Sequence, residues 1–89
     1  MRVKNINGTA DNNPPSGYVS WREWYSSRTG RWPNSCGCIL CHEQPTVGAH
    51  VKKVGSTDNS WYIIPLCKFH NNQFGEELDV VGDWLEPIR

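Results

Sequence analysis

Cysteine and histidine, both of which can bind a transition metal, are concentrated in two short stretches of the chain. The stretch CGCILC, residues 36–41, carries three thiols, and CKFH, residues 67–70, carries a thiol and an imidazole three positions apart. A structural zinc ion takes four such ligands in a tetrahedron, commonly as two closely spaced pairs. We therefore predict one structural Zn²⁺, with Cys67 and His70 as one pair of ligands and two upstream cysteines as the other.

The upstream stretch leaves open which two of its cysteines bind. Cys38 and Cys41 have the two-residue gap typical of a zinc knuckle and are preferred, but Cys36 could replace Cys38 with a four-residue gap that zinc sites also tolerate. The remaining cysteine would then be a small buried thiol beside the site. His42 is expected to face solvent. Two disulfides are the competing use of four cysteines, but the histidine at ligand spacing favours a metal.

A helix is predicted upstream of the cysteines. Ser20 and Glu23 form a capping box at its start, and Gly30 marks its end. Trp21, Trp24 and Tyr25 then lie on one face of this helix. Such an aromatic stripe can stack nucleobases, but the composition favours its use as core, because the chain has little else to bury.

The elements that must position the downstream ligands are a hairpin and a short helix. Residues 47–54 are predicted to form the first strand and residues 55–59 the turn. Residues 61–64, which are aromatic and β-branched, are predicted to form the second strand, and Pro65 is expected to end it. A helix over residues 68–74 then begins close to Cys67. A last small hairpin, residues 78–88, is predicted around a Gly-Asp turn. The fold class is therefore α+β, with an extra N-terminal helix and a C-terminal β-hairpin.

Composition sets the size of the domain and the kinds of partner. The chain has 89 residues, 37% of them hydrophobic, so a single small domain over residues 18–89 needs a staple such as a metal. Residues 1–17, rich in Asn, Gly and Pro, are predicted to form a flexible arm. The formal net charge is zero, which argues against a broad surface for nucleic acid, although Lys52, Lys53 and Lys68 could form a local patch.

The lack of recognisable targeting segments in this sequence predicts a cytoplasmic protein with no membrane partner. No segment has the apolar length needed to span a bilayer. The first 17 residues lack the apolar stretch of a signal peptide. A reducing compartment agrees with cysteines that bind metal as free thiols.

The order knuckle, hairpin, helix resembles the HNH, or ββα-metal, group of treble-clef zinc domains. The resemblance spans residues 36–72 and rests on the cysteine knuckle, on GAHV at residues 48–51 and on WYIIPLCKFHN at residues 61–71. It implies a zinc-framed fold with Cys38, Cys41, Cys67 and His70 as ligands. The same strings resemble short uncharacterised bacterial proteins whose first cysteine pair has a four-residue gap, which favours Cys36.

The resemblance also implies a nuclease site. His50 matches the family's catalytic histidine and would be the general base, while Asn71 matches the last position that holds a catalytic Mg²⁺ or Mn²⁺. Ala49 departs from the family, which commonly has Asp, Glu or His there as a second ligand. Asn59, or Asp58 beside it, could supply the missing oxygen from the turn. Alternatively, His50 hydrogen-bonds a loop carbonyl, supports a zinc ligand, or itself replaces His70 on the zinc.

Two functions follow from these features. The first is a small metal-dependent endonuclease acting on DNA or RNA, with His50 as base, Asn71 and Asn59 at the catalytic ion, and zinc as a structural cofactor. The second is a catalytically inactive zinc-binding module that interacts with nucleic acid or a protein partner. His50 and Asn71 at their matching positions favour the first function, whereas the incomplete cation site at Ala49 and the neutral charge favour the second.

Overall fold

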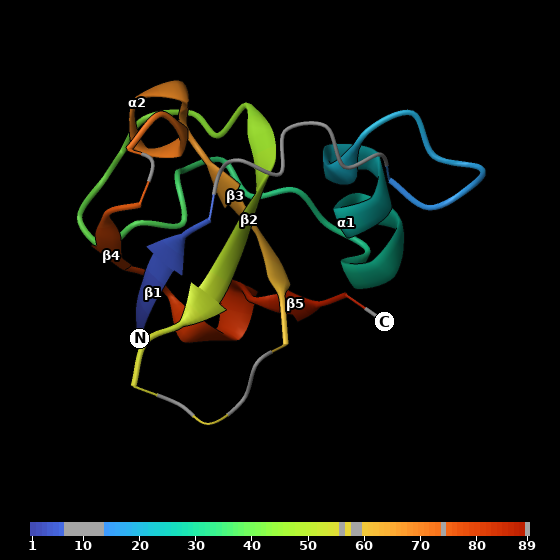
Figure 1. The fold of residues 1–89 in the computed structure, drawn as a ribbon. Helices are drawn as coiled ribbons and strands as arrows, with labels where there is room; N and C mark the ends of the chain where they lie inside the picture. Colours follow the sequence, from blue (N-terminus) through green and yellow to red (C-terminus); the bar gives the residue numbers. More distant parts are fainter. Residues whose placement is uncertain (7–13, 56, 58–59, 74, 89) are drawn as a thin grey trace.

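The computed structural model describes residues 1–6, 14–55, 57, 60–73 and 75–88. Its centre is a five-stranded antiparallel sheet with strand order β4-β1-β2-β3-β5 (Figure 1). The strands are β1 (Arg2–Asn5), β2 (Val47–Lys53), β3 (Tyr62–Leu66), β4 (Glu77–Asp79) and β5 (Glu86–Pro87). Two α-helices, α1 (Trp21–Thr29) and α2 (Lys68–Asn71), and a 3₁₀ turn η1 (Gly82–Trp84) complete the fold.

The predicted N-terminal helix is confirmed at both ends. Ser20 is the N-cap, and its Oγ accepts a 3.0 Å hydrogen bond from the backbone N–H of Glu23. Gly30 adopts the left-handed conformation, with φ of 76°, and its N–H bonds back to Ser26, which ends the helix. The aromatic stripe is core, because Trp24 and Tyr25 are buried against Ile63 of β3.

The central hairpin is confirmed, with Val47 opposite Leu66 and Val51 opposite Tyr62. The expectation that Pro65 ends the second strand is wrong, since β3 runs through this proline to Leu66. The carbonyl of Pro65 accepts a hydrogen bond from the N–H of Gly37 on the side of β3 that faces away from β2. The N–H and C=O of one residue in an antiparallel strand point to the same side, so the proline lacks an N–H only on this outer side. β5 pairs only with Tyr62 and Ile63, so no strand requires a donor at Pro65.

Both ends of the chain differ from the expectation. Residues 2–5, assigned to a flexible arm, form strand β1 between β2 and β4, while residues 7–13 of that arm lie outside the described residues. The prediction of a C-terminal hairpin is wrong, because β4 pairs with β1 and β5 pairs with β3, at opposite edges of the sheet. The strands β1 and β3 are longer than β4 and β5, so each of the two short strands gains more backbone pairing from a long strand than from the other short strand. Val80, which follows β4, is fully buried and fixes the start of the segment that leads from β4 to β5.

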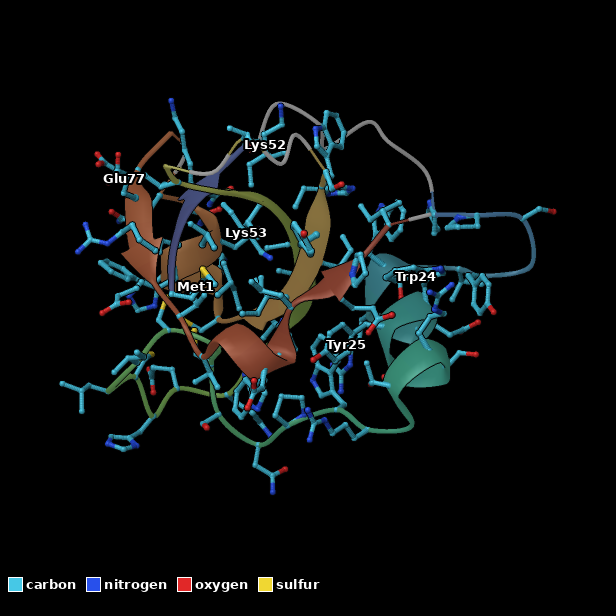
Figure 2. All side chains as sticks on the ribbon, turned by 90° about the horizontal axis from the view of Figure 1, so that it is seen from below. Met1, Trp24, Tyr25, Lys52, Lys53 and Glu77 are labelled. Atoms are coloured by element: carbon cyan, nitrogen blue, oxygen red, sulfur yellow. The ribbon has the colours of Figure 1, made fainter. Side chains whose placement is uncertain are left out.

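The sheet separates two layers. α1 covers the face that carries Ile63, whereas the cysteine loop and α2 lie on the face that carries Val51, Ile64 and Leu66 (Figure 1). Figure 2 shows Trp24 and Tyr25 on the α1 side of the molecule, Glu77 on the opposite side, and Lys52 and Lys53 between them. The described part of the chain has no helix that is both long and apolar enough to cross a bilayer.

Candidate metal centre

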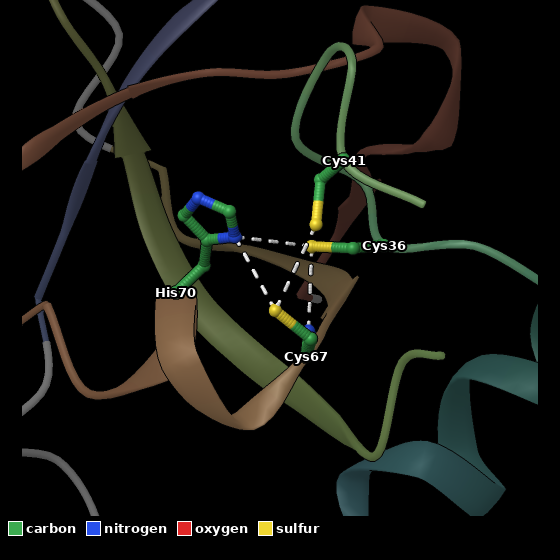
Figure 3. Close-up of side chains that lie close together, drawn as sticks. All are labelled: Cys36, Cys41, Cys67 and His70. Carbon is green, nitrogen blue, oxygen red and sulfur yellow. Dashed lines mark hydrogen bonds between the residues drawn. The ribbon is translucent and has the colours of Figure 1, made fainter. Parts of the chain in front are cut away.

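Four side chains from the cysteine loop and from α2 converge on one point (Figure 3). Their donor atoms, the Sγ atoms of Cys36, Cys41 and Cys67 and a ring nitrogen of His70, all lie within 4.8 Å of one another. Cys67 is the N-cap of α2, and His70 follows on the first turn, so the helix presents both to the cysteine loop. The cluster joins two segments that are more than 20 residues apart in the chain.

The spacing of these atoms agrees with a tetrahedral zinc ion. Bond lengths of about 2.3 Å for Zn–S and about 2.0 Å for Zn–N place the corners of a tetrahedron roughly 3.5–3.8 Å apart. The measured separations are 3.3 Å from Cys67 Sγ to His70 Nδ1, 3.6 Å from Cys36 Sγ to His70 Nδ1 and 4.0 Å from Cys41 Sγ to Cys67 Sγ. All four cysteines are free thiols, and a disulfide would need its two sulfurs at about 2.05 Å.

The cluster contains Cys36 and leaves out Cys38, which corrects the preference for Cys38 based on the two-residue gap. The loop turns at Gly37, whose backbone lies against β3, so that Cys36 reaches the centre and Cys38 does not. A Cβ on Gly37 would come within 2.7 Å of the Ile64 side chain and 2.8 Å of the Pro65 carbonyl oxygen, which only glycine avoids. Cys38 is buried beside the cluster.

Backbone donors surround the sulfur of Cys36. The N–H of Cys67 lies 3.3 Å from this sulfur and the N–H of Cys38 lies 3.5 Å from it. Such N–H groups stabilise a thiolate, which is the form that binds a metal. Three thiolates and one neutral imidazole give zinc a site with one net negative charge, which these donors offset in part.

The thiols perturb one another when no cation lies between them. A hydrogen bond with Cys38, together with burial, raises the pKa of Cys36, and the same hydrogen bond lowers the pKa of Cys38. Burial, with smaller effects from Cys36 and Cys67, raises the pKa of Cys41 to about 11. Protons must therefore leave the thiols when a metal binds, and metal affinity falls as the pH falls.

The side chain of Asn5 positions α2. The sequence gives no signal for this role, because residues 1–17 have almost no apolar periodicity and were therefore predicted to form an arm. The side chain is 1% exposed. Its Nδ2 donates to the carbonyl of His70 at 3.2 Å and to the carbonyl of Asn71 at 2.9 Å. These bonds satisfy carbonyls at the end of the helix and tie the metal-bearing turn to β1.

His50 lies on the other face of the sheet from this cluster. Side chains alternate along β2, so Ala49 and Val51 face the cysteine loop while His50 faces α1. The imidazole packs edge-on against the Trp21 ring at a centroid distance of 4.8 Å and lies 6.0 Å from the Trp61 ring. The side chain is 8% exposed, and burial lowers its pKa.

Of the other predicted nuclease residues, the structure describes Asn71, and this residue does not join His50. Asn71 ends α2 on the metal-bearing face, so the sheet separates it from His50. Asn59, like Asp58, falls outside the described residues. The Nε2 atom of His50 is buried and has no hydrogen-bond partner among the described residues. This atom therefore makes neither the expected bond to a loop carbonyl nor the expected bond to a zinc ligand.

The remaining site candidates also have definite places. His42 is exposed, as expected. Lys52 and Lys53 point to opposite faces because they are neighbours on β2, and each lies over an aromatic ring, 5.9 Å from that of Trp61 and 4.8 Å from that of Tyr62 respectively. Lys52 and Lys53 therefore do not belong to one patch on a single face of the sheet.

Comparison with protein-family models, with curated proteins and with solved structures gives no match to this chain.

Proposed function

We propose that the chain is a zinc-binding module without catalytic activity, in which one structural Zn²⁺ is held by Cys36, Cys41, Cys67 and His70. The observation that carries the proposal is the set of donor separations, 3.3–4.0 Å where measured and within 4.8 Å throughout, close to the edges of a zinc tetrahedron. All four positions are taken by protein ligands. Such a closed site suits a structural ion, since catalytic zinc keeps one position for water or substrate.

The nuclease reading has less support. A nuclease needs its general base and its cation ligand close enough together to act on the same phosphodiester, with the base within hydrogen-bond reach of the attacking water. His50 and Asn71 lie on different faces of the sheet, and Ala49 adds no oxygen ligand. A plasmid-nicking assay with Mg²⁺ or Mn²⁺ checks this, and cleavage that disappears in a His50→Ala variant would overturn the proposal.

The identity of the ligands is tested with two single substitutions. We expect Cys36→Ser to lose stoichiometric zinc, while the matched Cys38→Ser variant keeps one zinc per chain because Cys38 lies beside the site. Native mass spectrometry gives the stoichiometry, and the visible spectrum of the Co²⁺-substituted protein reports tetrahedral geometry and thiolate ligation. Zinc retained by the Cys36 variant and lost by the Cys38 variant would contradict the ligand set.

A further inference from the structure

Two surface hollows adjoin along residues 43–46, the loop that leads from the cysteine stretch into β2. The first has a volume of about 350 Å³ and is lined by Arg22 and Trp32, among others. The second has a volume of about 280 Å³ and is lined by Lys68 and Phe69, among others. Gln44 and Thr46 line both hollows, so we treat them as one surface, the 43–46 groove.

At the α1 end, the groove presents an arginine held in place. The guanidinium of Arg22 lies 4.7 Å from the centre of the Trp32 ring. The indole is fixed in turn, because its Nε1 donates to the carbonyl of Pro45 at 3.3 Å and its ring packs edge-on against that of Tyr25. Stacking leaves the in-plane N–H groups of a guanidinium available, and Arg22 has no ion-pair partner among the described residues. This end of the groove is prepared for a carboxylate.

At the α2 end, the groove presents an apolar ring. Phe69 is 66% exposed, although its position on α2 between Cys67 and His70 holds it in place. The ring contacts that of His70 edge-on at 5.2 Å. Lys68 and Glu43 are both exposed beside it and carry opposite charges. An apolar side chain is therefore the group that this end would bind.

The charges of the lining favour a peptide over a nucleic acid. The groove has two cations, Arg22 and Lys68, and the carboxylate of Glu43. A nucleic-acid groove follows several phosphates with several cations, and a carboxylate within it is repulsive. A peptide needs one carboxylate site, one apolar site and amide or hydroxyl groups for its backbone, which Asn34, Gln44 and Thr46 supply.

The geometry points to an extended peptide segment as the ligand of the 43–46 groove, with an acidic side chain on Arg22 and an apolar side chain on Phe69. The assignment names the partner class of the proposed zinc module and rests on it, since zinc holds α2 and therefore Phe69 in place.

The test uses blocked glycine peptides that carry one Asp and one Leu separated by one to four glycines. They are titrated into the ¹⁵N-labelled, zinc-loaded full chain, and the indole N–H signal of Trp32 is followed by NMR. We expect saturable shifts with at least one spacing, and roughly tenfold weaker binding when Asn replaces Asp or Ser replaces Leu. Absence of shifts for every peptide at millimolar concentration would sink the assignment.

Variants separate the groove from other surfaces. Arg22→Gln and Phe69→Ala are each expected to weaken binding roughly tenfold. Arg28→Gln is the matched control, because Arg28 lies on the same helix and over a tryptophan ring, but outside the groove and paired with Glu86 at 3.4 Å. Equal binding by Arg22→Gln would contradict the peptide site. An oligothymidylate that binds in a way dependent on Arg22 would replace the peptide with a single-stranded nucleic acid.

The zinc content of each sample distinguishes the two proposals. If native protein with one zinc per chain binds none of the peptides, the proposal of a zinc module is retained and the peptide assignment of the 43–46 groove is refuted. A chain without zinc removes the module itself, whatever the peptide titration gives.

Discussion

At the residue scale, the alternation of side chains along β2 decides more than residue type does. Ala49 and His50 are neighbours, yet one faces the cysteines and the other faces Trp21. The same strand needs glycine at position 48, where a Cβ would lie 2.9 Å from the Ile63 side chain and 3.0 Å from the backbone of Trp21. α1 therefore packs directly onto β2, and His50 is enclosed beside this contact.

The enclosure of His50 predicts a pH dependence of stability. Burial lowers the pKa of this imidazole in the folded state, so the unfolded chain binds a proton more readily. The contribution of neutral His50 to the free energy of unfolding is complete above about pH 6.5, the ordinary value, and is lost as the pH falls from there through the folded pKa. Urea denaturation of zinc-loaded protein between pH 5.5 and 7.5 measures it.

A His50→Phe variant is the comparison, since phenylalanine keeps an aromatic ring against Trp21 without a titrating group. We expect the stability of this variant to fall less than that of the native protein as the pH is lowered. Protonation of the zinc ligands affects both proteins alike and cancels in the difference. Parallel stability curves for the two proteins would show that His50 is not the titrating group.

At the element scale, α2 depends on its surroundings. A helix of four residues has almost no stability of its own, because nucleation is unfavourable and few internal hydrogen bonds follow. Cys67 and His70 would fasten it from the metal side, and Asn5 fastens it from the sheet. Strand β1 is thus part of the support for the metal centre, although it lies more than 60 residues from α2 in the chain.

Removing the side-chain amide of Asn5 tests this support. Asn5→Ala removes the side-chain donor to the carbonyls of His70 and Asn71, although His70 keeps the backbone N–H of Gln73, and is expected to lower the free energy of unfolding by about 1–3 kcal/mol. The matched control is Asn72→Ala, at the exposed end of α2, with an expected change within about 0.5 kcal/mol. Both variants should keep one zinc per chain. Equal unfolding midpoints for the two variants in urea would contradict the role of Asn5.

At the scale of the whole molecule, one sheet is covered on its two faces by unlike layers. Aromatic residues of α1 form one layer, and the cysteine loop with α2 forms the other. Both outer strands are protected against pairing with other chains. The N–H of Ile39 bonds to the carbonyl of Asp79 beside β4, and β5 contains Pro87, which cannot donate.

Because the proposed zinc ion would hold the cysteine loop and α2 together, we expect its removal by a chelator to lower the stability of the fold strongly. Zinc at a thousandfold excess over its dissociation constant would add about 4 kcal/mol to the free energy of unfolding. For a domain of this size, we expect an excess of a strong chelator to lower the melting temperature by roughly 15 °C or more. Calorimetry or circular dichroism measures the shift, and restored zinc should reverse it. A melting curve unchanged by chelator would refute a structural ion.

Local features of the chain determined the elements and the chemistry of the site. The Ser20 cap and Gly30 set the limits of α1. Aromatic and β-branched residues beside a polar turn indicated the β2–β3 hairpin, and the spacing of cysteine and histidine indicated a metal. Each of these signals depends on neighbours within a few residues, so a linear pattern contains it.

Only the tertiary structure decided which groups meet. It selected Cys36 over Cys38, put His50 and Asn71 on different faces, drew residues 2–5 into the sheet and sent β4 and β5 to opposite edges. These outcomes depend on contacts between residues far apart in the chain. A strand pairs with whichever edge is open, and a one-residue step reverses the face of a side chain, so local pattern cannot specify either result.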